Sequence, residues 1–261
     1  MTDTARVLVL GANGRMGSTV RAAVDADADL RLVAAVDPGG TPAPSATAVQ
    51  AVQAVPSLDD VDPAGVDVAV DFTVADATRA NAAWCARHGV HAVIGTTGLD
   101  DADVAAFRAA FDSSNCLIAP NFAVGAVLMM RFAELAAPHF GSAEVIELHH
   151  DAKVDAPSGT ALRTLERMAA ASSQWNADPT ETTLVPGARG GRGPGGIPVH
   201  SVRLRGLVAH QQVLLGADGE TLTIRHDTTD RSSFMGGVLL ACKVIGDHPG
   251  VTVGLDSYLG L

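Results

Sequence analysis

Lysine is the scarcest charged residue of this 261-residue chain. Lys153 and Lys243 are its two lysines, and arginine fills the other 16 of the 18 basic positions. Arginine stays protonated in nearly every protein environment, whereas a lysine in a closed site can shift its pKa and exchange a proton. The amine at position 153 therefore suggests a chemical role. As long as its neighbours are left aside, the chance occurrence of a lysine at this position is an equally good interpretation.

Cysteine and long apolar runs are also scarce. Cys85, Cys116 and Cys242 lie far apart with no CxxC pair, which argues against a disulfide framework or a zinc site. No apolar stretch approaches the roughly 18 residues of a membrane-spanning helix. The first residues, MTDTARVLVL, lack the basic region and long apolar core of a secretory leader. We therefore expect a cytoplasmic protein without a metal site or membrane contact.

Positive charge is in the minority, since the formal net charge is -11. Without a basic run, such a chain repels nucleic acid, so an anionic small substrate needs a local nest of cations and hydrogen-bond donors. Aromatic residues make up 4% and hydrophobic residues 47% of the chain. This composition is typical of a globular protein whose core is built from alanine, valine and leucine.

What is present from Arg6 to about Asn121 is a repeated pattern of short apolar runs, turns and helical segments. The strand candidates are RVLVLG, RLVAAVD, VDVAVDFT, HAVIGTT and CLIAPN. Apolar runs that do not alternate indicate strands buried on both faces, as in a parallel sheet covered by helices. The sequence therefore predicts an α/β fold with a Rossmann-like, doubly wound domain.

The pattern changes after residue 121. We expect helices over Val124–Pro138 and near Leu162–Ala171, then a flexible glycine-rich loop over 187–196. The runs VHSVRLR, VAHQQVLLG and ETLTIRHD predict the strands of a second, mixed sheet in an α+β domain. The apolar segment SSFMGGVLLACKVIG predicts a helix that packs back on the first domain.

A glycine-rich turn, LGANGRMG, follows the first predicted strand. Gly11, Gly14 and Gly17 allow a tight turn and close approach to a pyrophosphate at a helix N-terminus. Asp37 lies twenty residues further on, where a carboxylate can accept hydrogen bonds from ribose hydroxyls. Such turns also occur without a cofactor, but Asp37 in register favours dinucleotide binding.

The residue after Asp37 is Pro38 rather than arginine. A carboxylate facing the ribose disfavours a 2′-phosphate, and Arg15 is the one nearby residue that we identify as able to hold it. We expect NADH to be used at least as well as NADPH.

Two further turns, GTTG at 95–98 and APNF at 119–122, follow the fourth and fifth predicted strands. The carboxyl ends of parallel strands form the edge where open α/β sheets bind ligands. Each turn alone is weak evidence, because Gly-Thr turns are common in loops.

The stretch HHDAKVDAPSGTA, residues 149–161, combines two histidines, a lysine and a helix start. If the preceding residues form a strand, His149 and His150 point to opposite faces. Ser158 is a plausible N-cap, and the free N–H groups that follow it can bind an anion such as a carboxylate near Lys153.

Each histidine taken singly is better interpreted as structural, and a metal site with Asp151 has unsuitable spacing. The combination favours a catalytic site. We assign no role to the other histidines, and we expect Arg189 and Arg192 to lie in a solvated loop.

The combination of GANGRMG, GTTG, APNF and HHDAKVDAPSGTA resembles the 4-hydroxy-tetrahydrodipicolinate reductase family, particularly its actinobacterial members. The resemblance spans nearly the whole chain, and its last motif is highly specific. It implies NADH- or NADPH-dependent reduction of a cyclic dicarboxylate in the diaminopimelate route to lysine. It also implies a homotetramer, a dinucleotide-binding domain of residues 1–121 and 232–261, and a substrate-binding and tetramerisation domain of residues 122–231.

The resemblance also implies roles for individual residues. His149 is similar to the general acid, and Lys153 to a second proton donor or substrate anchor. The carboxylate-binding set is matched by His150, Ser158, Gly159 and Thr160. The cofactor contacts are matched by Gly11, Ala12, Asn13, Gly14, Arg15, Met16, Asp37, Gly95, Thr96, Thr97, Gly98, Ala119, Pro120, Asn121 and Phe122.

Two other interpretations of the sequence stay open. A non-catalytic NAD(H)-sensing module would bind NADH without oxidising it, and would leave Lys153 unexplained. Another Rossmann-type dehydrogenase, acting on an amino acid or a semialdehyde, would need a thiol in a suitable turn or a differently placed lysine and aspartate.

Overall fold

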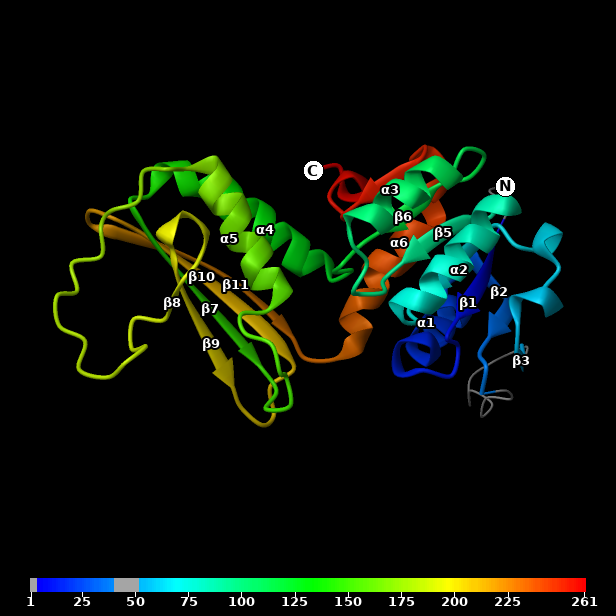
Figure 1. The fold of residues 1–261 in the computed structure, drawn as a ribbon, viewed down its shortest axis with the longest axis horizontal. Helices are drawn as coiled ribbons and strands as arrows, with labels where there is room; N and C mark the ends of the chain where they lie inside the picture. The colour runs from blue at the N-terminus through cyan, green and yellow to red at the C-terminus, as the bar shows by residue number, and fades with distance from the viewer. Residues whose placement is uncertain (1–3, 40–51) are drawn as a thin grey trace. The chain divides into compact units, whose positions relative to one another are not determined.

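A computed structural model describes residues 4–39 and 52–261. The chain forms two compact units (Figure 1). Unit 1 comprises Met1–Ala123 and Arg231–Leu261, and unit 2 comprises Val124–Asp230. Within the described ranges, every helix falls short of the length and apolar character needed to cross a membrane.

Unit 1 is built on a parallel sheet, which confirms the predicted Rossmann-like fold. Its described part has seven strands in the order β12-β6-β5-β4-β1-β2-β3. The strands are β1 (Ala5–Leu10), β2 (Leu30–Val36), β3 (Ala54–Val55), β4 (Val68–Asp71), β5 (His91–Ile94), β6 (Cys116–Ile118) and β12 (Val251–Val253). The strands β3 and β12 were not predicted, because strands of two or three residues leave almost no periodic signal.

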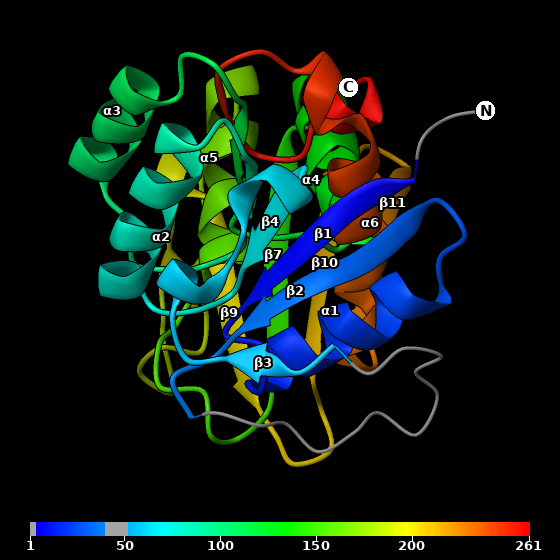
Figure 2. The same ribbon diagram turned by 90° about the vertical axis from the view of Figure 1, so that its right-hand side faces the viewer.

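Helices cover both faces of this sheet (Figure 2). The helices α1 (Arg15–Ala26) and α6 (Met235–Val244) pack on one face, and α2 (Ala75–Arg87) and α3 (Asp101–Ala110) pack on the other. The strand order changes direction at β1, because the chain moves outward to β2 and β3 and then returns to β4. Open α/β sheets bind ligands at this switch point.

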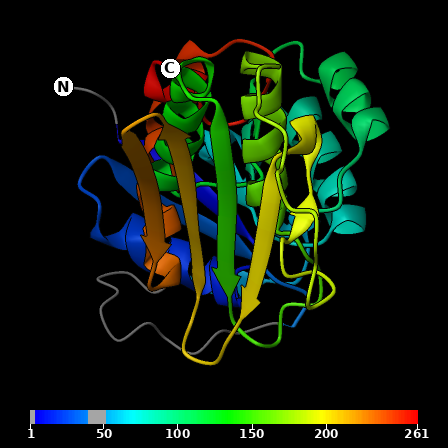
Figure 3. The same ribbon diagram turned by 90° about the vertical axis from the view of Figure 1, so that its left-hand side faces the viewer.

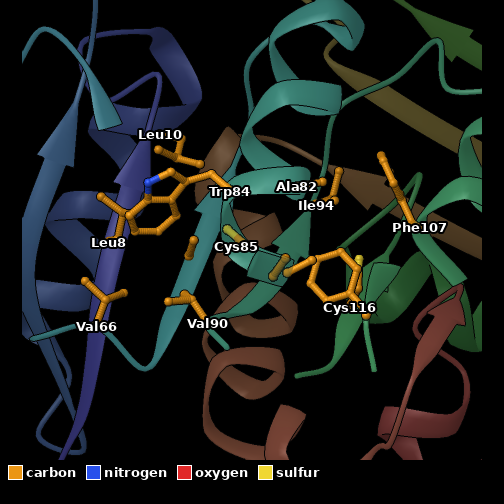
Figure 4. Packing of buried hydrophobic residues seen from close by; sticks show 14 of the residues in the cluster. Leu8, Leu10, Val66, Ala82, Trp84, Cys85, Val90, Ile94, Phe107 and Cys116 are labelled. Carbon is orange, nitrogen blue, oxygen red and sulfur yellow. The ribbon is translucent and has the colours of Figure 1, made fainter. Parts of the chain in front are cut away.

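Small apolar side chains fill the core of unit 1 (Figure 4). Leu8, Ile94 and Cys116 lie in the sheet, and Trp84 and Cys85 pack on it from α2. The three cysteines are free and buried. Burial raises the pKa of the Cys85 thiol to about 12, so this thiol is a packing group rather than a nucleophile.

Unit 2, whose residues are all described, has a mixed sheet in the order β11-β10-β7-β9-β8. Its strands are β7 (Ser142–His149), β8 (Gly191–Arg192), β9 (Pro198–Arg203), β10 (Ala209–Ala217) and β11 (Glu220–Thr228). β7 and β9 are parallel, and the other neighbouring pairs are antiparallel. The helices α4 (Val124–Ala136) and α5 (Gly159–Ala171) cover one face, and Figure 3 looks onto the other face.

Two predictions for unit 2 need correction. The first helix ends at Ala136 and continues as a 3₁₀ turn, because Pro138 lacks an N–H group and cannot extend an α-helix. The glycine-rich loop over 187–196 contains strand β8 and a 3₁₀ turn. Arg189 in this loop binds Glu144 at 2.7 Å, and Arg192 binds Asp178 at 3.2 Å, so both arginines form ion pairs within their own unit.

Short 3₁₀ turns complete the described structure, at Leu58–Asp60, Pro63–Gly65, Ala137–His139, Pro194–Gly196, Arg231–Phe234, Ile245–Asp247 and Ser257–Leu259.

Candidate active site

The turn between β1 and α1 has the geometry of a phosphate-binding loop. Gly11 has a φ of +69°, and its carbonyl accepts a hydrogen bond from the Gly14 N–H at 3.0 Å. A Cβ atom on Gly17 would lie 2.0 Å from the Gly11 carbonyl oxygen. The close packing of helix against turn therefore requires glycine, and it leaves the start of α1 open to an anion.

Asp37 follows β2 and lies beside this turn. Its carboxylate accepts the Asn13 N–H and the Gly39 N–H, both at 2.9 Å. A cavity of about 640 Å³ adjoins these groups, and Gly11, Gly14 and Asp37 are among its lining residues. This size and this lining fit the adenosine end of a dinucleotide.

The remaining residues of the predicted glycine-rich turn differ in exposure. Ala12 is buried against the sheet and Met16 is half-buried, whereas Asn13 and Arg15 are exposed. The side chain of Ala12 therefore serves packing, and Arg15 lies on the open side of the turn.

The turns after β5 and β6 lie at the same carboxyl edge of the sheet, but several of their side chains serve packing. Thr96 is buried, and its hydroxyl accepts a hydrogen bond from the Thr78 hydroxyl at 2.8 Å. A Cβ atom on Gly95 would lie 2.1 Å from the ring of Phe72. Thr97 and Gly98 are exposed, so these two residues are the part of the turn that a ligand can contact.

In the turn after β6, too, several side chains serve packing. Ala119 and Phe122 are buried, and the Phe122 ring packs on Phe72 with 5.7 Å between centroids. The Asn121 side chain accepts the Ala123 N–H at 2.9 Å, and Pro120 is exposed. Backbone groups are therefore the principal ligand contacts that this turn can offer.

Asp71, at the end of β4, contacts the turn after β5 and was not among the predicted site residues. It is buried, and its carboxylate accepts the Thr73 N–H at 2.8 Å, the Asn81 side chain at 2.9 Å and the Thr96 hydroxyl at 3.3 Å. Burial of a carboxylate is costly unless hydrogen bonds satisfy it. Asp71 thus ties β4 to α2 and to the turn after β5.

In unit 2, the end of β7 carries the first predicted catalytic residue. His149 is the last residue of the strand, and Glu147 lies two positions earlier on the same face. The His149 Nδ1 atom lies 2.5 Å from Glu147 Oε2. The side chain of Glu147 is fully buried, whereas that of His149 is 14% exposed, so the ring has one edge on the carboxylate and can present the other to a ligand.

Arg203, at the end of β9, completes the surroundings of Glu147. Its guanidinium donates to both carboxylate oxygens, at 2.9 and 2.8 Å. The Ser158 N–H also donates to Glu147, at 3.2 Å. Burial alone would raise the pKa of Glu147, but the hydrogen bonds from Arg203, Ser201 and His149 hold it below its usual range, so the carboxyl is ionised at neutral pH.

Opposing interactions act on the pKa of the His149 imidazole. Burial lowers its pKa, and the positive charges of Lys153 and Arg203 act in the same direction, whereas Glu147 raises it. The net result is a pKa below the usual value for histidine. The folded protein therefore favours the neutral ring over the protonated one.

Lys153 does not stand free in this structure. Its Nζ atom donates to both carboxylate oxygens of Asp155, at 2.7 and 2.8 Å. Asp155 is 59% exposed at its side chain, so an incoming carboxylate can replace it. His150 is exposed and follows the end of β7, and it therefore does not share the buried position of His149.

The start of α5 has the predicted serine cap. Ser158 is the N-cap residue, and its hydroxyl accepts the Ala161 N–H at 3.2 Å. Gly159 is exposed and Thr160 is half-buried. A Cβ atom on Gly159 would meet nothing within 4 Å, so the first turn of α5 is open to a ligand of unit 2.

The sequence analysis missed Glu147, Arg203 and Asp155 in this unit. A signal for Glu147 was available, because strand periodicity places residues 147 and 149 on one face. Arg203 carried no such signal, since the parallel pairing of β7 with β9 brings together residues more than fifty positions apart.

Two family descriptions match consecutive parts of the chain. The family described as "Dihydrodipicolinate reductase, N-terminus" matches residues 5–122, and "Dihydrodipicolinate reductase, C-terminus" matches residues 125–259.

Curated relatives cover nearly the whole chain. The chain is 51% identical to 4-hydroxy-tetrahydrodipicolinate reductase of Nocardia farcinica, over 99% of this chain and 100% of the relative. It is 49% identical to the enzyme of the same name from Cutibacterium acnes, over 98% and 99%. A solved dipicolinate-bound dihydrodipicolinate reductase from Paenisporosarcina sp. TG-14 superposes with a TM-score of 0.87 at 38% identity, covering 97% of this chain and 99% of the other.

Proposed function

The chain belongs to the dihydrodipicolinate reductase family and is an oxidoreductase, and we propose that it reduces 4-hydroxy-tetrahydrodipicolinate to tetrahydrodipicolinate with a pyridine nucleotide. This is a step of the diaminopimelate route to lysine. The observation that supports the proposal most directly is the placement of His149, Lys153 and the open N-terminus of α5 in one unit. Together they offer a proton donor and a cradle for a dicarboxylate.

The proposed cofactor site is the carboxyl edge of the sheet in unit 1. The bound cofactor, when reduced, supplies a hydride. The glycine-rich turn would hold the pyrophosphate at the start of α1, and Asp37 would accept from the adenosine ribose. The cavity beside Asp37, which Gly11 and Gly14 also line, fits these groups. The turns 95–98 and 119–122 would contact the nicotinamide end.

The proposed substrate site lies in unit 2. The backbone N–H groups at Gly159 and Thr160, with the Ser158 cap, would hold one substrate carboxylate at the positive end of α5. Lys153 would bind a carboxylate in exchange for Asp155, and the exposed His150 would assist it. His149 would donate a proton to the substrate from its Nε2 atom, as a general acid.

Loss of NADH absorbance tests the reaction. The purified chain is given NADH and the condensation product of pyruvate and aspartate semialdehyde, and we expect absorbance to fall with turnover. The His149→Gln variant is the control, because it removes the proposed acid and leaves the cofactor site intact. An enzyme that binds NADH tightly but oxidises none of it with this substrate would instead be a sensing module.

Cofactor preference is a finer proposal. Asp37 faces the proposed ribose site, and the next residue is the exposed Pro38. We expect kcat/KM for NADH to equal or exceed that for NADPH, because a carboxylate repels a 2′-phosphate. Steady-state kinetics with both cofactors measure the ratio. A preference for NADPH of about a hundredfold, equivalent to roughly 2.7 kcal/mol, would contradict this proposal.

We also propose a cytoplasmic homotetramer assembled through the sheet of unit 2. Its support is the family resemblance together with the sheet face that α4 and α5 do not cover (Figure 3). Light scattering coupled to gel filtration measures the mass. A mass four times that of one chain is expected, and a single-chain mass at working concentration would refute the assembly.

A further inference from the structure

The carboxylate of Glu147 contacts both the proposed acid and the start of the helix that is proposed to hold the substrate. Its Oε2 atom receives His149 Nδ1 and one nitrogen of Arg203, and its Oε1 atom receives the other nitrogen of Arg203 and the Ser158 N–H. The side chain is 0% exposed. Burial of a carboxylate costs free energy unless its partners compensate for the lost hydration. The position of Glu147 between the proposed acid and the proposed carboxylate site therefore calls for a functional explanation.

The contacts of Glu147 determine which nitrogen of His149 carries the proton. Arg203 donates to both carboxylate oxygens, and this bidentate arrangement requires an ionised carboxylate. An ionised carboxylate can only accept hydrogen bonds. The Nδ1 atom of His149 must therefore be the donor, which leaves Nε2 as the nitrogen that exchanges a proton with a ligand.

The same carboxylate also fixes the start of α5. The Ser158 N–H donates to Glu147, and the Ser158 hydroxyl caps the helix at Ala161. Glu147 thus contacts both the proposed acid and the backbone of the proposed carboxylate site. A small shift of one group relative to the other would misplace the proton with respect to the bound substrate, and such shifts are costly in catalysis.

We propose that Glu147 is a positioning residue, which holds His149 as the Nδ1–H tautomer and keeps this acid in register with the substrate cradle at the start of α5. The inference rests on the proposed function, because it assumes that His149 is the acid. Arg203 acts here as the partner that keeps Glu147 ionised.

Several charged groups face His149 and enter any pH measurement. Glu147 lies on its own strand, Arg203 comes from β9, and Lys153, which is paired with Asp155, comes from the loop after β7. The positive groups oppose protonation of the ring, and Glu147 favours it. Replacing Glu147 by a neutral residue therefore leaves the ring with cations as its strongest charged neighbours.

The matched control is on the same strand. Glu144 lies on the opposite face of β7 and contacts His200 Nε2 at 2.6 Å, so it forms the same kind of carboxylate–histidine pair away from His149. Glu144→Gln removes a comparable ion pair without touching the proposed acid. Both variants are measured for kcat and KM between pH 5 and 9, with folding checked by circular dichroism.

For Glu147→Gln we expect kcat to fall roughly tenfold to a hundredfold, the range found when the partner that orients a functional histidine is removed. The alkaline limb of the pH profile should move to lower pH. The Glu144→Gln control should keep kcat within about twofold and should leave the pH profile unchanged, as for a surface substitution. Adding Glu147→Gln to the His149→Gln variant should cause no further loss, because groups that act as a unit are non-additive.

The outcomes separate this inference from the proposed function. A Glu147→Gln enzyme with the kcat and pH profile of the unaltered chain would overturn the inference alone, provided that His149→Gln is inactive. An active His149→Gln enzyme would overturn the proposed acid and the inference with it.

If Glu147→Gln does not fold, the unaltered protein decides the question. Nitrogen-15 NMR at high pH reports the tautomer of each histidine, and the His149 signals are those absent from His149→Gln. We expect the Nδ1–H form for His149 and the Nε2–H form for His200, since these two rings meet their carboxylates through different nitrogens. An Nε2–H tautomer of His149 would overturn the inference.

Discussion

The two lysines of the chain have different surroundings, although both form ion pairs. Lys243 binds Asp27 at 2.8 Å and Asp29 at 3.0 Å, and hydrogen bonding to Asp27 raises its pKa. Lys153 binds Asp155, and its positive charge acts on His149. A salt bridge alone would accept arginine at either position. The location of Lys153 therefore supports the chemical role better than its scarcity does.

Replacing either proposed catalytic side chain should abolish most activity. We expect His149→Ala and Lys153→Ala each to lower turnover by roughly a hundredfold or more, the span of general acid catalysis. Lys243→Ala is the matched control and should keep turnover within about twofold, as for a surface substitution. Initial rates with saturating cofactor measure all three, and near-normal turnover in His149→Ala or Lys153→Ala would refute the role of that residue.

Asp155 should act as a competitor for the Lys153 amine. An exposed ion pair of this kind is worth about 0.2–1 kcal/mol, and a substrate carboxylate has to displace it. We expect Asp155→Asn to lower the KM for the substrate by about twofold to fivefold, with kcat little changed. A raised KM would show instead that Asp155 helps to place Lys153 for binding.

At the scale of elements, glycines decide how closely helices approach the turns of unit 1. Gly17 of α1 packs on the Gly11 carbonyl, and Gly237 of α6 packs on the Phe122 carbonyl. In both helices the approach is too close for a Cβ atom. Helix α6 therefore supports the backbone of the turn after β6, which is one of the turns proposed to contact the cofactor.

Adjacent glycines in α6 provide a test of this packing. A Cβ atom on Gly237 would lie 2.2 Å from the Phe122 carbonyl oxygen, whereas one on Gly236 would meet nothing within 4 Å. We expect Gly237→Ala to lower the free energy of unfolding by about 1–3 kcal/mol through overpacking. Gly236→Ala should leave it unchanged or raise it by about 0.5–1 kcal/mol, because alanine favours a helix. Urea denaturation compares them, and equal effects would contradict the packing argument.

At the scale of the whole molecule, most of the shifted histidine and carboxyl groups have pKa values below their ordinary ones. Burial lowers the pKa of His91 and His226, and hydrogen bonding to Arg6 lowers that of Asp67. A group whose pKa is lower in the folded state binds fewer protons than in the unfolded state, so it makes stability fall as pH falls. Asp25, whose pKa burial raises, acts in the opposite sense.

The melting temperature should therefore be nearly constant between pH 8 and 7 and should fall below the unfolded histidine pKa of about 6.5. The carboxylates add a second loss below about pH 4. His91→Asn should flatten the first part of the decline, since the His91 Nδ1 atom accepts the Asn115 N–H and would lose this bond on protonation. Differential scanning fluorimetry across pH measures it, and a melting temperature that rises on acidification would contradict the sign.

The sequence by itself determined the parallel sheet of unit 1, the mixed sheet of unit 2, the glycine-rich turn between β1 and α1, and the family. These follow from signals local in the chain: apolar runs, glycine spacing and the 149–161 stretch. The cap at Ser158 was predictable for the same reason. The tertiary structure alone decided the partners of the charged groups, because strand pairing joins residues distant in sequence. It placed Arg203 on Glu147 and turned Thr96 toward Asp71.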